Sequence, residues 1–267
     1  MIKSKEIQQK SIFLRVRDQQ IEKDYILSWI LRGISSNNIL SKTLVFKGGT
    51  VLKKAYFKDY RFSEDLDFTL LDSTISNKEI IKQFTLSFEY IKDQANIPLE
   101  IIDQNTHHDG GINFYISYIG PLGGHKNNKK VKIDIAKTEI LQFSPIMKNI
   151  FINYSDLDNH KLNCYSLEEC LIEKLRSTMQ RMQARDFYDI WFILEKEKID
   201  INFYINEFCI KCENKGLSIS DFHTTINKRL SQYKGKWENS LKHQIHDLPD
   251  FEKVKRETMR HIRNMVL

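Results

Sequence analysis

The chain has 267 residues, of which 28% are charged and 11% aromatic, and its formal net charge is +6 at pH 7. This length allows one large or two modest domains with buried cores, and the composition excludes a disordered or low-complexity protein. No run approaches eighteen apolar residues and the N-terminus lacks an apolar signal core, so we expect a cytoplasmic protein with no membrane partner.

Apolar side chains recur at helical spacing over residues 5–34 and predict two helices there. A short strand over 43–46 should follow, leading into Lys47, Gly48, Gly49 and Thr50 and then a helical stretch over 51–56. Two glycines before a helix let the backbone approach a ligand closely and direct free N–H groups toward an anion. We therefore expect Gly48, Gly49 and Thr50 to cradle phosphates, with Lys47 in a supporting role.

Residues 61–67 read Arg-Phe-Ser-Glu-Asp-Leu-Asp and lead into an apolar, β-prone run. A strand there places Asp65 and Asp67 on one face of a sheet, where two carboxylates repel unless a cation lies between them. Mg²⁺, or Mn²⁺ in its place, is the expected cation, because Mg²⁺ is commonly held by one or two carboxylates together with substrate phosphates. We expect Ser63 to hydrogen-bond a phosphate and Arg61 to brace the loop.

The middle of the chain predicts a small mixed sheet with helices packed against it. A helix should begin near Asn77, and the stretches 107–111 and 120–128 have the composition of a hairpin turn and a longer loop. Strand-like runs lie near 98–103, 112–119 and 130–137.

Asp134 lies in the last of these runs, on a strand expected beside that of Asp65, and shares its face with Lys132 and Ala136. A third carboxylate near a metal pair can orient or deprotonate an attacking hydroxyl, so we expect Asp134 to prepare the acceptor. The alternative is an exposed polar strand position without a role.

From residue 166 onward the pattern is helical almost throughout and predicts a helical bundle. Ser166-Leu-Glu-Glu169 is a capping-box signature, in which the hydroxyl and the carboxylate each accept from the other's free N–H. Lys174 lies at the edge of the apolar stripe that follows, as do Arg181 and, if the helix continues, Arg185. We expect Lys174 to contact a phosphate; the alternative is that it extends past the core to water.

Asp186 and Asp189 are one helical turn apart, and Arg185 stands four residues before Asp189. An internal ion pair is the plain explanation for at least one of the two aspartates. Further helices are expected over 199–213, over 218–246 with a break near 233–235, and over 249–264.

Two features of this half have alternative interpretations. Cys209 and Cys212 have zinc-ligand spacing, but no second pair follows, so two partly buried thiols are favoured. The last helix carries basic side chains along one side and an apolar stripe opposite, which is typical of either a surface helix or an RNA-contacting ridge. The basic residues are Lys253, Arg256, Arg260 and Arg263.

Four of these segments, in this order, resemble the AbiEii/MenT nucleotidyltransferase toxins, a branch of the polymerase-β-like nucleotidyltransferase superfamily. The segments are Gly48-Gly49-Thr50, Arg61-Phe-Ser-x-Asp65-x-Asp67, the acid-bearing strand Val131-Lys132-Ile133-Asp134-Ile135, and a helix with Lys174 followed by Arg185-Asp186-Phe187-Tyr188-Asp189. The resemblance implies an α+β, polymerase-β-like domain, which we place over 1–160, and a C-terminal helical bundle over 161–267 that contributes to the nucleotide cleft.

The resemblance also implies an activity: Mg²⁺-dependent transfer of a nucleoside monophosphate from an NTP to RNA, commonly a tRNA 3′ end. It implies that Lys174 works at the nucleotide with Asp186 or Asp189, and that the toxic outcome is neutralised by a partner antitoxin protein. Two rival hypotheses remain. One is an enzyme of the same fold that modifies a small molecule or a protein side chain, and the other is a catalytically silent nucleotide-binding or interaction module.

Overall fold

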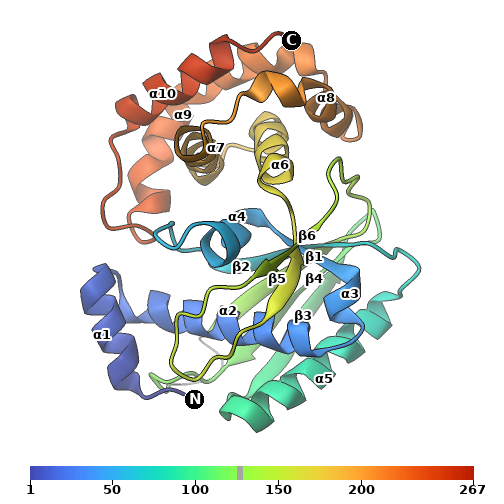
Figure 1. Ribbon diagram of the computed structural model, residues 1–267, viewed down its shortest axis with the longest axis vertical. Helices are drawn as coiled ribbons and strands as arrows, with labels where there is room; N and C mark the ends of the chain where they lie inside the picture. The colour runs from blue at the N-terminus through green and yellow to red at the C-terminus, as the bar shows by residue number, and fades with distance from the viewer. Residues whose placement is uncertain (125–128) are drawn as a thin grey trace. The chain divides into compact units, whose positions relative to one another are not determined.

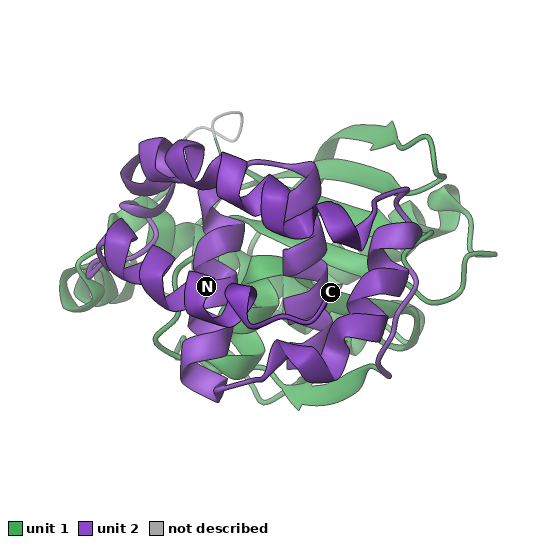
Figure 2. Ribbon diagram, turned by 90° about the horizontal axis from the view of Figure 1, so that it is seen from above, with its two compact units in different colours: residues 1–139, 145–164 green, residues 140–144, 165–267 purple. Residues whose placement is uncertain are grey.

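The computed structural model describes residues 1–124 and 129–267 and divides the chain into two compact units (Figure 2). Unit 1 comprises Met1–Glu139 and Pro145–Cys164, and unit 2 comprises Ile140–Ser144 and Tyr165–Leu267. The end of the loop predicted at 120–128 lies outside the described residues. Within the described part of the chain, no helix combines the length and apolar character needed to cross a bilayer.

The helices of unit 1 include both of those predicted near the N-terminus. The Ser76 hydroxyl caps the helix that starts at Asn77, since it accepts a 3.1 Å hydrogen bond from the Glu79 N–H. The helical stretch expected at 51–56 begins earlier, directly at Gly48, and its second half is a π-helix. The helices are α1 Ser4–Leu14, α2 Asp18–Ser36, α3 Leu40–Thr43, α4 Gly48–Val51, the π-helix η1 Leu52–Tyr56 and α5 Asn77–Ala95.

A seven-stranded mixed sheet forms the centre of unit 1, in the order β3-β4-β5-β2-β1-β7-β6, which confirms the predicted mixed sheet. Strand β2 lies between β5, to which it is parallel, and β1, to which it is antiparallel. The predicted hairpin turn joins β3 to β4, where the His107 N–H donates to the Gly111 carbonyl at 2.8 Å. The strands are β1 Leu44–Lys47, β2 Asp65–Leu70, β3 Leu99–Thr106, β4 Ile112–Tyr118, β5 Lys130–Ala136, β6 Ile146–Asn149 and β7 Lys161–Cys164.

The two faces of this sheet differ in chemistry. Helices α2 and α5 pack against each other (Figure 1). The α5 side chain Phe84 meets Phe114 of β4, with ring centroids 5.0 Å apart. Leu66 and Ile133, partners across β2 and β5, are buried on the same side of their strands as this apolar layer. Because side chains alternate along a strand, the acidic positions of β2 and β5 must occupy the other face.

Unit 2 is a helical bundle, as predicted, with two corrections. The break expected near 233–235 is wrong: α9 runs through it, because Tyr233 is buried and stacks on Phe187 at 5.1 Å while Gly235 sits in open space. Helix α6 ends at Gln180, so it does not continue to Arg185. The helices are α6 Leu167–Gln180, α7 Ala184–Glu197, η3 Ile201–Tyr204, α8 Ile205–Glu213, η4 Ile219–Asp221, α9 Phe222–Leu241 and α10 Phe251–Arg263.

The capping box before α6 forms only in part. The Ser166 hydroxyl accepts from the Glu169 N–H at 3.1 Å, as predicted. The Glu169 carboxylate instead accepts from the N–H groups of Gln142 and Phe143, at 2.8 and 2.9 Å, and lies 2.6 Å from the Lys211 ammonium. The buried Glu169 carboxylate thus ties the 140–144 segment to the start of α6 within unit 2.

The last helix has the amphipathic pattern that the sequence predicts. Phe251, Val254, Thr258 and Ile262 of α10 are buried, whereas the four basic side chains of its other side are exposed. Cys209 and Cys212 are free thiols, the first half-buried and the second buried, in agreement with the favoured interpretation of that pair.

Candidate active site

Gly48 occupies a backbone position that only glycine fits well. It follows β1 directly, with φ at +77°, and a Cβ built on it would lie 2.2 Å from Oδ2 of Asp67. The β1–β2 register explains this contact, because Lys47 is the partner of Asp67 across the ladder. The start of the α4 segment therefore lies directly against the Asp67 carboxylate, with no side chain between them.

The next residues of the loop are fixed by contacts with β2 and with the residues that precede this strand. The Thr50 hydroxyl donates to the Asp65 carbonyl at 2.5 Å, and Thr50 is buried. A Cβ at Gly49 would lie 2.5 Å from Nη2 of Arg61, so this guanidinium packs against the glycine backbone. Arg61 is itself buried and donates from Nη1 to the Phe62 carbonyl at 3.2 Å. Ser63, just before β2, is also buried.

The three predicted aspartates share one face of the sheet. Asp65 and Asp67 are half-buried and alternate with the buried Leu66. Asp67 and Asp134 are direct partners in the parallel pairing of β2 with β5, which places Asp134 beside the Asp65 strand, as predicted. The structure thus brings the glycine turn and the three carboxylates together within unit 1.

Lys132 is a member of this cluster that the sequence analysis did not assign. Its ammonium lies 2.8 Å from Oδ2 of Asp134. Burial lowers the pKa of Lys132, but the hydrogen bond and charge of Asp134, with the charges of Asp67 and Asp65, outweigh it and raise the pKa. Lys132 therefore stays charged and reduces the repulsion among the aspartates. The alternation of side chains along the strand was sufficient to place Lys132 on the face of Asp134.

His107 and Asn113 complete the surroundings of Asp134. Nε2 of His107 lies 3.9 Å from Oδ2 of Asp134 and 2.7 Å from Nδ2 of Asn113, and Asn113 is the β4 partner of Asp134. These contacts depend on the register of the β4–β5 pair and on the β3–β4 turn. No local sequence signal could have indicated them.

The residues of this site fit a divalent cation that also binds substrate phosphates. Among the described residues, no group of three or more His, Cys, Asp or Glu side chains is arranged to hold a metal unaided. Mg²⁺ needs less, since one or two carboxylates suffice when water and substrate phosphates supply the other ligands. Asp65 and Asp67 offer two such carboxylates, and the space at Gly48 that a Cβ would fill adjoins one of them.

Unit 2 holds an ion cluster of Lys174, Asp186, Asp189 and Arg181, in which all but Arg181 are buried. The Lys174 ammonium lies 2.7 Å from both Oδ1 of Asp186 and Oδ2 of Asp189, and Nε of Arg181 lies 2.8 Å from Oδ2 of Asp186. Burial would raise the pKa of Asp186, but the Lys174 and Arg181 charges outweigh it and hold that pKa well below its usual range. Arg185, the partner of Asp189 suggested by spacing, lies in α7 with it, but Asp189 is buried and its carboxylate meets Lys174 of α6 instead.

Solved structures of known proteins share the fold of this chain. MenT4, a nucleotidyltransferase toxin from Mycobacterium tuberculosis, is 16% identical with a TM-score of 0.68, covering 100% of this chain and 91% of its own. JHP933 from Helicobacter pylori is 16% identical with a TM-score of 0.61, covering 93% of this chain and 92% of its own. At these identities both show the fold alone.

The family evidence comes from the sequence itself. No curated protein matches the chain. The family described as "Nucleotidyl transferase AbiEii toxin, Type IV TA system" matches residues 29–257, which is most of the chain and includes all four motif segments. The resemblance stated from the motifs is confirmed: the chain belongs to the AbiEii family of nucleotidyltransferase toxins.

Proposed function

We propose that this toxin transfers a nucleoside monophosphate from an NTP to a hydroxyl group of RNA, with a tRNA 3′ end as the acceptor and Mg²⁺ or Mn²⁺ as the metal. The observation that carries the proposal is the contact between the Gly48 backbone and the Asp67 carboxylate. It brings a phosphate-binding turn and a pair of metal-binding acids to one place. The RNA acceptor and an antitoxin partner are what the family resemblance implies.

The glycine turn would bind the NTP phosphates through backbone N–H groups at the start of a helical segment, where the helix dipole favours an anion. Gly48 is only half-buried and has no side chain, so a phosphate can approach its backbone closely. The Thr50 hydroxyl is already bonded to the Asp65 carbonyl, so Thr50 contributes its N–H and holds Asp65 in place. When bound, the metal held by Asp65 and Asp67 supplies charge stabilisation for the phosphates and the pyrophosphate leaving group.

Asp134 would take the proton from the acceptor hydroxyl, because it lies in register with Asp67 on the neighbouring strand. Lys132 positions Asp134 through their 2.8 Å contact. Ser63 would hydrogen-bond a phosphate, and Lys47 and Arg61 would support the loop.

The Lys174 cluster would contribute a cation to nucleotide binding. Two aspartates hold its ammonium at 2.7 Å each, so Asp186 and Asp189 act by fixing the lysine rather than by touching phosphate. Arg181, which is bonded to Asp186 and largely exposed, and Arg185 would support this contact.

Labelling of RNA tests the proposal. The protein is incubated with each labelled NTP in turn, Mg²⁺ and total RNA, and the products are separated by size. We expect label in a tRNA-sized band and none after chelation of the metal. Label on protein or on a small acceptor would overturn the RNA assignment. No incorporation, with NTP binding that survives Asp65→Ala and Asp67→Ala together, would indicate a silent nucleotide-binding module.

A further inference from the structure

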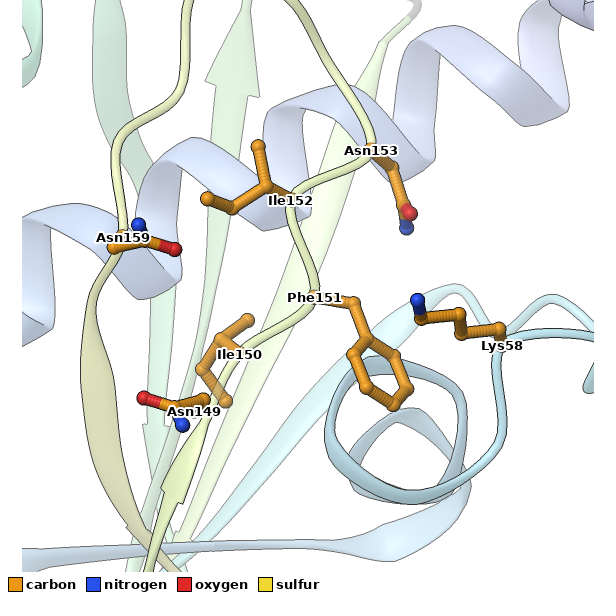
Figure 3. A pocket seen from close by; sticks show the side chains of 7 residues that line it. All are labelled: Lys58, Asn149, Ile150, Phe151, Ile152, Asn153 and Asn159. Carbon is orange, nitrogen blue, oxygen red and sulfur yellow. The ribbon is translucent and has the colours of Figure 1, made fainter.

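A groove on unit 1 lies beyond the residues assigned to nucleotide transfer. It consists of two adjoining hollows, of about 610 and 300 Å³, that share Lys58, Ile152 and Asn153. We call it the lysine groove. Figure 3 shows part of it, with Lys58 beside Phe151 and with Asn149 and Asn159 on neighbouring segments. Its lysines are Lys10, Lys53 and Lys58.

Each lysine of the groove lies near an aromatic ring. The Lys58 ammonium is 5.5 Å from the ring centroid of Phe151, and that of Lys10 is 5.3 Å from Tyr154. The Lys53 ammonium lies 4.6 Å from the Phe62 ring. Tyr154 and Phe62 are buried, whereas Phe13, which also lines the groove, is 84% exposed and Phe151 is half-buried, so these two rings can meet a base. Proteins hold a single nucleic-acid strand by such a combination, with phosphates on cations and bases stacked on accessible rings.

The ammonium groups at the exposed positions of the groove can meet a ligand. Two acids also line it: Asp24 is already paired with the buried ammonium of Lys54 at 2.7 Å, and Asp59 is exposed next to Lys58, so the three lysines outnumber the one acid that is not held by Lys54. Lys53 is buried and donates to the Lys58 carbonyl at 2.7 Å, so it fixes the turn that presents Lys58. Lys58 is exposed and Lys10 is half-buried, which leaves both ammonium groups able to meet phosphates.

The groove is connected to the active site by one short rigid segment. Helices α4 and η1 run without interruption from Gly48 to Tyr56, and Lys58 follows two residues later. The Phe151 N–H donates to the Lys54 carbonyl at 2.8 Å, which joins the opposite wall of the groove to the same segment. Nine helical residues span about 13 Å, or about four nucleotides of a stacked strand.

We infer that the lysine groove holds the single-stranded part of the RNA acceptor, a few nucleotides before the 3′ end that receives the nucleotide. This inference rests on the proposed function, because it assumes an RNA acceptor. An acidic protein would need only the lysines. The accessible rings of Phe13 and Phe151, together with the amides of Asn149, Asn153 and Asn159, match bases and ribose hydroxyls as well.

Charge reversal in the groove tests the inference. Lys10→Glu and Lys58→Glu are combined, and RNA binding is measured without NTP by fluorescence anisotropy of a labelled tRNA. Removing two phosphate contacts from a single strand weakens binding about 25-fold at 0.1 M salt and lowers the salt slope by about 1.4. The double charge reversal should weaken it by at least this much, because the new carboxylates also repel phosphate, while NTP binding stays unchanged. Lys58→Gln alone, which keeps the alkyl chain near Phe151, should weaken binding about fivefold.

A matched control uses a lysine on the other side of unit 1. Lys92 is exposed on α5, which packs against β3, the edge strand opposite β6. Lys92→Glu should leave tRNA affinity within about threefold of wild type, since it changes only the long-range, salt-screened charge. Acceptor fragments shorter than about four nucleotides should bind the wild type and the double variant equally.

The outcomes separate this inference from the proposed function. A double variant that binds tRNA as tightly as a labelling-competent wild type would overturn the groove assignment and leave nucleotide transfer to RNA intact. A double variant that keeps its RNA affinity but no longer binds the cognate antitoxin would also overturn the groove assignment. That result would assign the groove to a protein partner. A wild type that neither binds nor labels RNA would overturn both.

Discussion

Replacement of Asp67 by alanine is expected to reduce nucleotide transfer about 1,000-fold or more, because it removes one of the two carboxylates that hold the metal beside the phosphate-binding turn. The side chain is half-buried at the sheet surface, so the protein should remain folded. The measurement is the initial rate of incorporation of labelled nucleotide, with circular dichroism and thermal unfolding recorded on the same preparation.

Glu64→Gln is the matched control for this substitution. It changes a carboxylate three positions away whose Oε2 lies 3.0 Å from the Lys23 ammonium. We expect its transfer rate to stay within about twofold of wild type, because this half-buried pair is still open to solvent and such pairs contribute little to stability. An Asp67→Ala rate within tenfold of wild type would contradict the role given to this carboxylate.

Gly48→Ala is expected to lower the transfer rate more than 100-fold and to reduce the free energy of unfolding by about 1–3 kcal/mol. The alanine must adopt a φ near +77°, and its Cβ must displace the Asp67 carboxylate, whose Oδ2 would otherwise be 2.2 Å away. The damage should therefore reach the metal-binding acid. The rate and the thermal unfolding midpoint are measured together.

Gly216→Ala measures the free-energy cost of a positive φ at alanine without a steric clash of its Cβ. Gly216 has a similar φ of +67°, but a Cβ there would meet nothing within 4 Å. This variant should lose about 1 kcal/mol of stability and keep its transfer rate. Equal transfer rates for the two variants would show that the turn at Gly48 does not need to contact Asp67 for activity.

Local sequence patterns were sufficient to predict much of the fold and the central residues of the site. The alternation Asp65-Leu66-Asp67 was enough to place both acids on one sheet face, since strand side chains have a fixed period of two. The Ser166 cap and the two faces of α10 were equally readable, because caps and amphipathic stripes depend on residues a few positions apart.

What could not be predicted depends on tertiary contacts. Glu169 fits a capping box by spacing, yet Lys211 and the N–H groups of residues 142 and 143 compete for its carboxylate. Gly235 suggested a helix break, but burial of Tyr233 beside it keeps α9 intact. The phosphate contact of Lys174 stays a prediction, whereas the two aspartates that hold its ammonium are visible only in the structure. Each of these results depends on contacts with residues of other helices or segments, which the local sequence does not indicate.

The position of the metal tests the central claim most directly. Crystals of the protein soaked with Mn²⁺ and a non-hydrolysable NTP analogue would be measured for anomalous scattering from manganese. We predict a peak within coordination distance of Asp65 and Asp67, with the triphosphate against the backbone of Gly48 and Gly49. A peak bound elsewhere, or a triphosphate that does not touch the glycine turn, would contradict this account.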